Sequence, residues 1–287
     1  MPVTQRTDTD PPPALEDTFA DVIGKAQRGL GVDDRALAKK AHLPPEVLAR
    51  LKDGQFTDDA MTSVAGALGL NGGALLALAK GAYPLASDVA VDGVETFSSN
   101  FDGMTVNSYL VWNTANATGI AFDTGTDCEP MLAFMAKHKI RIPLILLTHT
   151  HEDHVAQMLR LKDATGAHVF VSAAEALLGC ETFSGDHRFK IGGLEVQTRA
   201  TVGHSVGGTT YAISGLAKPV AIVGDALFAG SMGGGFVSYK DGLETACASI
   251  FTLPDDTILC PGHGPRTTVA HERKYNPFFA GRCQPET

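Results

Sequence analysis

Residues that bind metals gather in one short stretch of this 287-residue chain. Residues 149–154 read His-Thr-His-Glu-Asp-His, so three imidazoles and two carboxylates lie within six positions. Imidazole and carboxylate groups together suit zinc, iron or manganese, whereas calcium and magnesium prefer ligand shells made only of oxygen. The stretch therefore predicts a metal site of the first kind.

The neighbouring residues predict where this stretch lies in the fold. Residues 143–147 form a short apolar run typical of a buried strand, and residues 155–161 have the pattern of a helix. The candidate ligands would then lie on a strand-to-helix turn, at the carboxyl end of a strand. Open α/β sheets place their binding sites at such ends.

Three residues further along the chain are candidates for the same site. Each follows an apolar, strand-like segment or lies beside a glycine, where the backbone can turn tightly: His204, Asp225 and His263. We therefore expect ligands from several separate segments to meet at one place.

This spaced set resembles the metal-binding pattern of the metallo-β-lactamase superfamily, in which an HxHxDH motif is followed by a His, a bridging Asp and a last His. The pattern is complete and in order in this chain, as His149, His151, Asp153, His154, His204, Asp225 and His263. The resemblance covers about residues 94–280. A spaced set of this kind is far more specific than the short motif alone.

The resemblance implies two divalent metal ions, for which Zn²⁺ is expected and Fe or Mn are alternatives. It assigns to the first ion His149, His151 and His204. It assigns to the second ion Asp153, His154 and His263, and it has Asp225 bridge the two. The implied chemistry is attack of a metal-bridged hydroxide on a carbonyl, with Asp153 and Asp225 as the catalytic carboxylates.

Asp123, in the sequence Phe-Asp-Thr-Gly, matches an acidic residue that precedes the motif in this family. The resemblance implies that its carboxylate fixes a ligand or the motif backbone by hydrogen bonding. A turn-capping role before Thr-Gly is the alternative. Glu152, inside the motif, is interpreted as an acid at a helix start rather than as a ligand.

Two segments resemble one subfamily, the hydroxyacylglutathione hydrolases (glyoxalase II), which implies thioester hydrolysis. These segments are residues 224–233 and the run Pro-Gly-His-Gly-Pro-Arg-Thr-Thr at 261–268. The chain departs from that pattern at 233–236, where it has Gly-Gly-Gly-Phe and short relatives commonly have Arg-Thr-Asp. The C-terminal helical domain of the long enzymes is also not expected. Tyr239 and Lys240, just beyond the glycines, are the candidate substrate contacts.

Other functions stay open at this point. A lactonase, or a mono-iron persulfide dioxygenase that uses His149, His204 and Asp225, would share the histidines. A transcription regulator with a metallo-β-lactamase-fold sensor domain is the alternative from a different class.

The chain is expected to be an α/β protein: two strand-rich halves with outer helices match the αββα metallo-β-lactamase sandwich that the resemblance implies, and a small all-α domain precedes them. Residues 1–13 are expected to be a disordered leader, 14–80 a helical domain, 81–93 a linker and 94–287 the hydrolase domain. Helices are expected at 14–29, 33–41, 44–53, 57–68, 72–80, 128–138, 241–251 and 267–279. Strands are expected at 97–102, 107–112, 119–125, 143–147, 169–171, 194–198, 209–213, 220–224 and 258–260.

Residues 33–54 within the helical domain resemble a λ-repressor-type (Xre-like) helix-turn-helix. Residues 14–80 carry eight basic and nine acidic side chains, a sum of −1, whereas operator-binding modules normally present a basic face. The candidate recognition helix offers only Arg50 and Lys52, late in the helix. DNA binding is therefore the weaker interpretation, and a role in packing or in a homodimer is the stronger one.

The composition indicates which binding partners and which cellular compartment to expect. The formal charge of −9 argues against a general affinity for nucleic acid or anionic membranes, and no apolar stretch approaches the length that spans a bilayer. The cysteines are odd in number and scattered, which favours a reducing compartment over a disulfide framework: Cys128, Cys180, Cys247, Cys260 and Cys283. We expect a cytoplasmic enzyme with a small-molecule thioester or ester substrate.

Overall fold

Two six-stranded sheets make up most of the structure, a computed structural model that describes residues 14–283. The first sheet contains, in spatial order, β1 (Val94–Phe101), β2 (Met104–Asn113), β3 (Thr118–Phe122), β4 (Arg141–Leu146), β5 (His168–Ser172) and β6 (Glu181–Phe183). The second contains β12 (Thr267–Thr268), β11 (Ile258–Pro261), β10 (Val220–Gly224), β9 (Thr209–Ser214), β8 (Leu194–Ala200) and β7 (Arg188–Ile191). The pairs from β3 to β6 and the pair β10–β11 are parallel, and the others are antiparallel.

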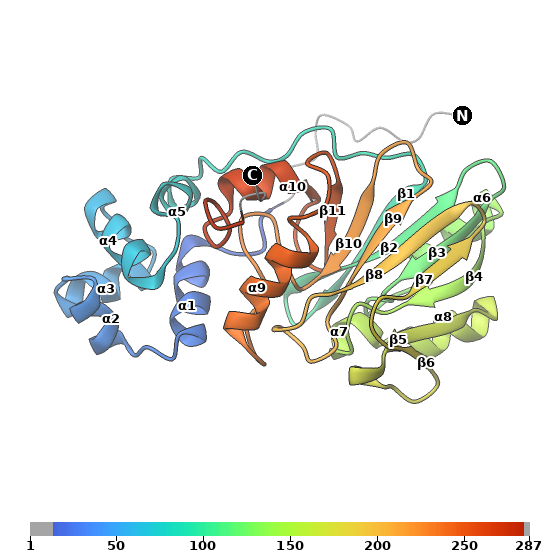
Figure 1. The fold of residues 1–287 in the computed structure, drawn as a ribbon, viewed down its shortest axis with the longest axis horizontal. Helices are drawn as coiled ribbons and strands as arrows, with labels where there is room; N and C mark the ends of the chain where they lie inside the picture. The colour runs from blue at the N-terminus through green and yellow to red at the C-terminus, as the bar shows by residue number, and fades with distance from the viewer. Residues whose placement is uncertain (1–13, 284–287) are drawn as a thin grey trace.

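The two sheets pack face to face, with helices on both outer faces (Figure 1). Apolar side chains from both sheets fill the space between them, among them Phe122 from β3 and Tyr211 from β9, whose rings lie 5.4 Å apart. The helices α6 (Glu129–His138) and α8 (Met158–Thr165) cover the first sheet, and α9 (Tyr239–Ser249) and α10 (Val269–Tyr275) cover the second. The predicted αββα sandwich is confirmed.

Five helices precede the sandwich and form one end of the molecule, coloured blue to cyan in Figure 1. They are α1 (Phe19–Gly29), α2 (Asp34–Lys40), α3 (Pro45–Lys52), α4 (Asp58–Leu68) and α5 (Gly72–Ala79). Polar side chains at Thr18, Asp33, Thr57 and Asn71 accept hydrogen bonds from the first turns of four of them. The first helix begins later than predicted because Thr18 and Asp21 form a capping box there.

The helix predicted at 267–279 is shorter in the structure. Thr267 and Thr268 pair with β11 as a short strand, and the Thr268 side chain then caps α10. The helix ends at Tyr275 because Asn276 precedes a proline, which disfavours the helical conformation at the residue before it.

The helical region shares a core with the second sheet and its helices. One continuous cluster of buried side chains includes Ile23 of α1 and Leu75 of α5 together with Val223 of β10, Ala246 of α9 and Phe279. The predicted linker at 81–93 also packs at this boundary, where the Tyr83 hydroxyl donates to Glu272 Oε1 at 2.5 Å. The five helices are therefore joined to the sandwich by core packing as well as by the chain.

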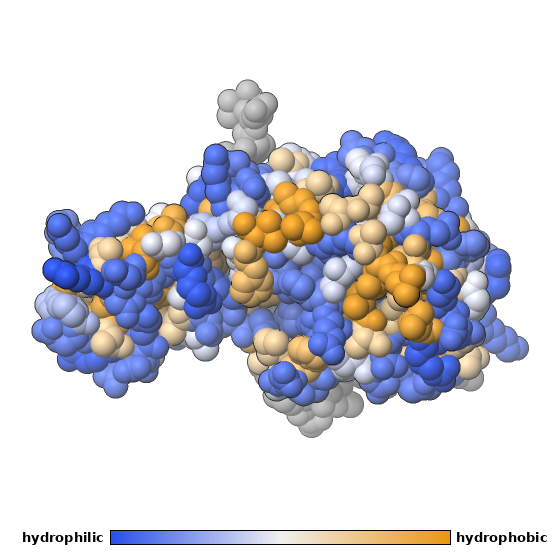
Figure 2. Space-filling view, turned by 90° about the horizontal axis from the view of Figure 1, so that it is seen from below, coloured by the Kyte–Doolittle hydropathy of each residue, from blue (hydrophilic) through white to orange (hydrophobic). Residues whose placement is uncertain are grey.

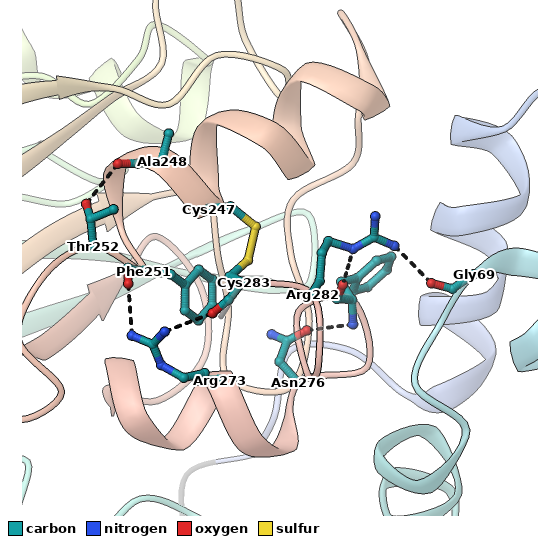
Figure 3. The surroundings of a disulfide bond; sticks show 10 residues. Gly69, Cys247, Ala248, Phe251, Thr252, Arg273, Asn276, Arg282 and Cys283 are labelled. Atoms are coloured by element: carbon teal, nitrogen blue, oxygen red, sulfur yellow. Dashed lines mark hydrogen bonds between the residues drawn. A yellow bond between two sulfur atoms is a disulfide. The ribbon is translucent and has the colours of Figure 1, made fainter. Parts of the chain in front are cut away.

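The segment after α10 returns across α9 and connects the two regions (Figure 3). Cys283 forms a disulfide with Cys247 of α9, and Arg282 donates to the carbonyl oxygen of Gly69, at the end of α4, at 2.9 Å. The disulfide differs from the expectation of unpaired cysteines, because the returning chain brings together two residues that are 36 apart in sequence. Cys128, Cys180 and Cys260 are free.

The surface is mainly hydrophilic, with separate hydrophobic patches on the face seen in Figure 2. Within residues 14–283, no helix has both the length and the apolar character needed to cross a membrane. The predicted leader, residues 1–13, lies outside the described residues.

Candidate metal centre

The candidate ligands come from loops that follow strands at one edge of the sandwich. His149 and His151 follow β4, and α7 (Glu152–Val155) begins directly after them, as the sequence predicts. The other three ligand-bearing loops follow β8, β10 and β11, and they carry His204, Asp225 and His263. The fold therefore brings together at one place residues that are up to 114 positions apart, from 149 to 263.

Two glycines let these loops approach closely. Gly224 has a φ of +49°, and a Cβ there would lie 2.6 Å from the Thr148 hydroxyl. The end of β10 therefore packs directly against Thr148, the residue before His149. A Cβ at Gly262 would overlap the Asp225 carboxylate. Both positions therefore require glycine for steric reasons.

The seven candidate ligands form overlapping groups. One group is His149, His151 and His204, and a second is Asp153, His154 and His263. In the first group, the His151 Nδ1 lies 3.1 Å from the His149 Nε2 and 2.9 Å from the His204 Nε2. These are the two groups that the family resemblance implied, and a third group, His149, His154 and Asp225, overlaps both.

Asp225 lies between the two groups. Its Oδ2 is 3.4 Å from the Nε2 atoms of both His204 and His263, and its Oδ1 is 3.3 Å from the His154 Nε2. The carboxylate therefore faces both groups at once.

The donor set fits divalent metal ions. Among the described residues, His154 Nε2 and Asp225 Oδ1 are buried without a hydrogen-bond partner, although an unpaired buried polar atom is costly. The His151 Nδ1 also lies 2.9–3.1 Å from one ring nitrogen each of His149 and His204, and a shared cation would stabilise this convergence. The chemistry of these groups suits zinc or another divalent metal of the same kind.

Hydrogen bonds on the far side of the rings orient four of the histidines. The Nδ1 atoms of His204 and His263 donate to the carbonyl oxygens of Gly234 at 2.9 Å and Thr105 at 2.8 Å, which leaves each Nε2 free to bind a metal. His149 Nδ1 lies 3.0 Å from the Thr148 hydroxyl.

Asp123 orients the fourth histidine and the motif backbone. Its Oδ2 lies 2.9 Å from His154 Nδ1 and accepts from the Thr148 hydroxyl at 2.8 Å, while its Oδ1 accepts from the Thr148 N–H at 2.7 Å. This geometry corresponds to the ligand-fixing arrangement that the sequence suggested for Asp123.

Burial and neighbouring charges shift the ionisation of the ligands. Burial, together with His154, holds the pKa of His149 well below its ordinary value, so the ring is neutral and able to bind a metal. Burial alone would raise the pKa of Asp225, but His154 and His263 outweigh it and hold that pKa well below its ordinary value. Asp225 is therefore a carboxylate throughout the physiological range.

A pocket of about 460 Å³ opens beside the candidate ligands, and we call it the metal pocket. Its polar lining includes His151, Glu152, Asp153, His204, Asp225 and His263. Its apolar lining is Phe101, Met104, Phe228 and Phe236, and the Phe236 ring lies 5.2 Å from the ring of His204. The glycine run contributes Gly233 and Gly234 to the same wall.

The two candidate substrate contacts lie outside this lining. Tyr239 is buried, with its ring against Gly29 of α1. Lys240 is exposed on α9 and forms an ion pair with Glu244 at 3.7 Å. Glu152 begins α7, as interpreted from the sequence, and its side chain reaches the pocket wall.

Sequence reasoning missed two contributions to the site. Glu175, after β5, accepts from the N–H groups of Thr150 at 2.8 Å and Gly207 at 2.7 Å, so it ties the motif loop to the loop that carries His204. Three residues of the N-terminal region, Glu16, Asp17 and Lys25, line the metal pocket. Glu175 follows the strand next to β4, and that position was the only available signal.

Comparisons with known proteins agree with this geometry. Residues 101–263, more than half of the chain, match the family described as the metallo-beta-lactamase superfamily. A probable metallo-hydrolase of Streptococcus pyogenes is 28% identical over 201 residues, which cover 60% of this chain and 85% of that protein. The hydroxyacylglutathione hydrolase of Cereibacter sphaeroides is 34% identical over 185 residues, which cover 62% of this chain and 68% of that enzyme.

A solved structure has the same fold over the catalytic region. The crystal structure of TTHA1623 in a di-iron-bound form superposes with a TM-score of 0.52 and 25% identity, and the match covers 63% of this chain and 99% of that one. The family match, the relatives and the ligand geometry all support the prediction of a metal-dependent hydrolase. The chain belongs to the metallo-beta-lactamase superfamily.

Proposed function

We propose that this protein is a thioester hydrolase of the glyoxalase II-like type that uses two divalent metal ions, with zinc as the expected metal. The observation that carries the proposal is the position of Asp225, whose carboxylate lies 3.3–3.4 Å from histidine nitrogens of both ligand groups. The name of the Cereibacter sphaeroides relative supports the reaction, and the di-iron form of TTHA1623 supports a site for two ions.

Each ligand group would hold one ion. His149, His151 and His204 would bind the first, Asp153, His154 and His263 the second, and Asp225 both. Ions bound there would supply Lewis acidity, which activates water and polarises a carbonyl at neutral pH. Asp153 and Asp225 are therefore the proposed catalytic carboxylates, since they would hold the ions that activate the water.

The residues around the ligands have their own parts in this proposal. Asp123 keeps His154 in one tautomer and one orientation. Glu175 keeps the motif loop and the loop carrying His204 in register. The apolar side chains of Phe236 and Met104, which are 74% and 44% exposed, offer a surface for the part of the substrate that does not react.

Hydrolysis of S-lactoylglutathione by zinc-loaded protein tests the proposal, with His151→Ala as the control. We expect a saturable kcat/KM of about 10⁴ M⁻¹ s⁻¹ or more, two metal ions per chain, and loss of both activity and bound metal in the variant. A rate equal to that of the control would exclude S-lactoylglutathione as a substrate, and other thioesters and lactones would then be tested. Full activity in the variant would overturn the metal mechanism.

Oxygen uptake separates the dioxygenase alternative. A mono-iron persulfide dioxygenase would use His149, His204 and Asp225, and the Asp225 Oδ2 lies 3.4 Å from the His204 Nε2. Iron-loaded protein that consumes oxygen with a persulfide, but does not hydrolyse thioesters, would favour that reaction.

The helical region, in this proposal, serves the enzyme rather than DNA. Lys52, one of two basic side chains on the candidate recognition helix, forms an ion pair with Asp34 at 2.7 Å. The region also shares its core with the second sheet. Salt-dependent binding to one DNA sequence would instead support the regulator alternative. We further propose a cytoplasmic location and leave the oligomeric state to a sedimentation measurement.

A further inference from the structure

The segment that leads into α1 forms part of the metal pocket. Glu16 and Asp17 line the pocket together with Lys25 of α1. The backbone nitrogen of Glu16 lies 3.3 Å from the place that a Cβ on Gly264 would occupy, so this segment packs directly against the loop that carries His263. The N-terminal region therefore completes a wall that the sandwich alone leaves open.

A set of polar contacts fixes this wall. The Lys25 Nζ donates to the Asp17 carboxylate at 2.5 Å and to the carbonyl oxygen of Met232 at 2.8 Å. The Ser231 hydroxyl donates to the same Asp17 oxygen at 2.5 Å. The Lys25 Nζ also lies 4.8 Å from the centre of the Phe228 ring. These contacts occupy the charges of both Lys25 and Asp17 within the protein.

Glu16 differs from its two neighbours. Among the described residues, no side-chain hydrogen bond or ion pair engages its carboxylate, although the residue is only partly exposed and lines the pocket. With Lys25 paired to Asp17, Glu16 and Glu152 are the charged residues of the lining that are neither candidate metal ligands nor part of that ion pair. The mouth of the pocket is therefore acidic.

Aromatic and apolar side chains accompany this acidic mouth. Phe236 and Met104 are exposed beside the ligands, and Phe101 lines the same pocket. A pocket lined by both carboxylates and aromatic rings is a suitable environment for an alkylated or protonated amine, since ring faces attract cations and a carboxylate compensates the charge. An anionic group would meet the carboxylates of Glu16 and Glu152 there.

We propose that Glu16 is a specificity-determining residue that selects thioesters whose non-reacting part carries a positively charged amine. The inference rests on the proposed thioester hydrolysis and adds the class of substrate. It also gives the N-terminal region a direct part in substrate recognition. Polyanionic thioesters are the class that this mouth disfavours.

Two thiols that differ only in charge test the inference without requiring turnover. Thiocholine carries a quaternary nitrogen, and neohexyl thiol has a carbon atom in that place. The sulfur atoms of both thiols bind zinc, so a difference in their affinities reports on the charge of the trimethylammonium group. Calorimetry on the zinc-loaded full-length protein measures both affinities, at about pH 8, where a carboxylate is ionised. The variant is Glu16→Gln, and the matched control is Asp58→Asn, an exposed carboxylate on α4 outside the pocket.

We expect thiocholine to bind the wild-type protein at least about tenfold more tightly than neohexyl thiol. In Glu16→Gln the ratio falls to within about twofold, and in Asp58→Asn it stays at the wild-type value. Equal binding of the two thiols to the wild-type protein overturns the inference, and so does binding of neither. A parallel weakening of both thiols in Glu16→Gln also overturns it, because that result indicates a structural role.

Hydrolysis of acetylthiocholine and S-lactoylglutathione, measured in parallel, separates the two proposals. Selective binding of thiocholine without hydrolysis of either thioester supports charge selection by Glu16 and contradicts the proposed thioester hydrolysis. Metal-dependent hydrolysis of both thioesters, with no preference between the two thiols in binding, supports the proposed thioester hydrolysis and contradicts charge selection by Glu16.

Discussion

Two glycines on α1 allow a sharp test of how this helix docks on the enzyme. A Cβ at Gly29 would overlap the ring and Cβ of Tyr239 on α9. A Cβ at Gly24, one and a half turns earlier, would meet only the guanidinium end of Arg28, at 3.1 Å. The same substitution, glycine to alanine, therefore meets a fixed obstacle at one position and a flexible one at the other.

The expected energies have opposite signs. Alanine favours a helix over glycine by about 0.5–1 kcal/mol, so Gly24→Ala should stabilise the protein by about that amount. At Gly29 the helix gain is opposed by overpacking, which costs about 1–3 kcal/mol, so Gly29→Ala should destabilise by about 1 kcal/mol. The two variants should therefore differ by about 2 kcal/mol, or about 4–8 °C in Tm for a protein of this size.

Thermal unfolding followed by circular dichroism measures this difference, with the metal content held equal in all samples. Thiol binding by the same variants adds a second measurement, since α1 carries Lys25 to the wall of the metal pocket. Equal stabilisation by both substitutions would refute the reasoning, because it would mean that α1 does not pack on α9 in solution.

Three further predictions concern the site and its supports. Removal of metal with a chelator should lower the Tm by at least about 5 °C, since a ligand at a hundred times its Kd stabilises the fold by about 2.7 kcal/mol; an unchanged Tm would argue against a bound metal. Glu272→Gln should lower the free energy of unfolding in urea by about 3 kcal/mol, because the fully buried Glu272 carboxylate accepts hydrogen bonds from Tyr83, Thr267 and Gly230 at 2.5–2.9 Å. A free energy of unfolding within about 0.5 kcal/mol of the wild-type value would contradict this role. Burial raises the pKa of the Cys260 thiol to about 11, so iodoacetamide at about pH 8 should modify this residue only after unfolding, as mass spectrometry would detect.

The sequence predicted the candidate ligands because metal chemistry restricts residue types. His149 and His151 are separated by one residue on a turn after an apolar strand, and a pattern of that kind is readable without knowing the fold. Asp225 and His263 were found for the same reason, since Asp225 ends an apolar, strand-like run and His263 lies between two glycines. The αββα architecture was implied by the family resemblance, and the two strand-rich halves with outer helices matched it.

Contacts between distant segments were not predictable in this way. Glu175 is one acidic residue among many in the sequence, and only the parallel pairing of β4 with β5 brings it to Thr150. The pairing of Cys247 with Cys283 likewise depends on the chain turning back after α10. Spacing along the chain contains no information about such tertiary neighbours.

The boundary between the helical region and the sandwich shows the same limit of sequence reasoning. Composition changes sharply near residue 80, and a change of that kind predicts a separate domain. In the structure, Ile23 and Leu75 share one core with Val223 of β10, the strand that directly precedes Asp225. Separation of the helices would expose this apolar surface on both sides to water, which is unfavourable in proportion to its area. The shared core therefore couples the packing of the five helices to the strand that precedes Asp225.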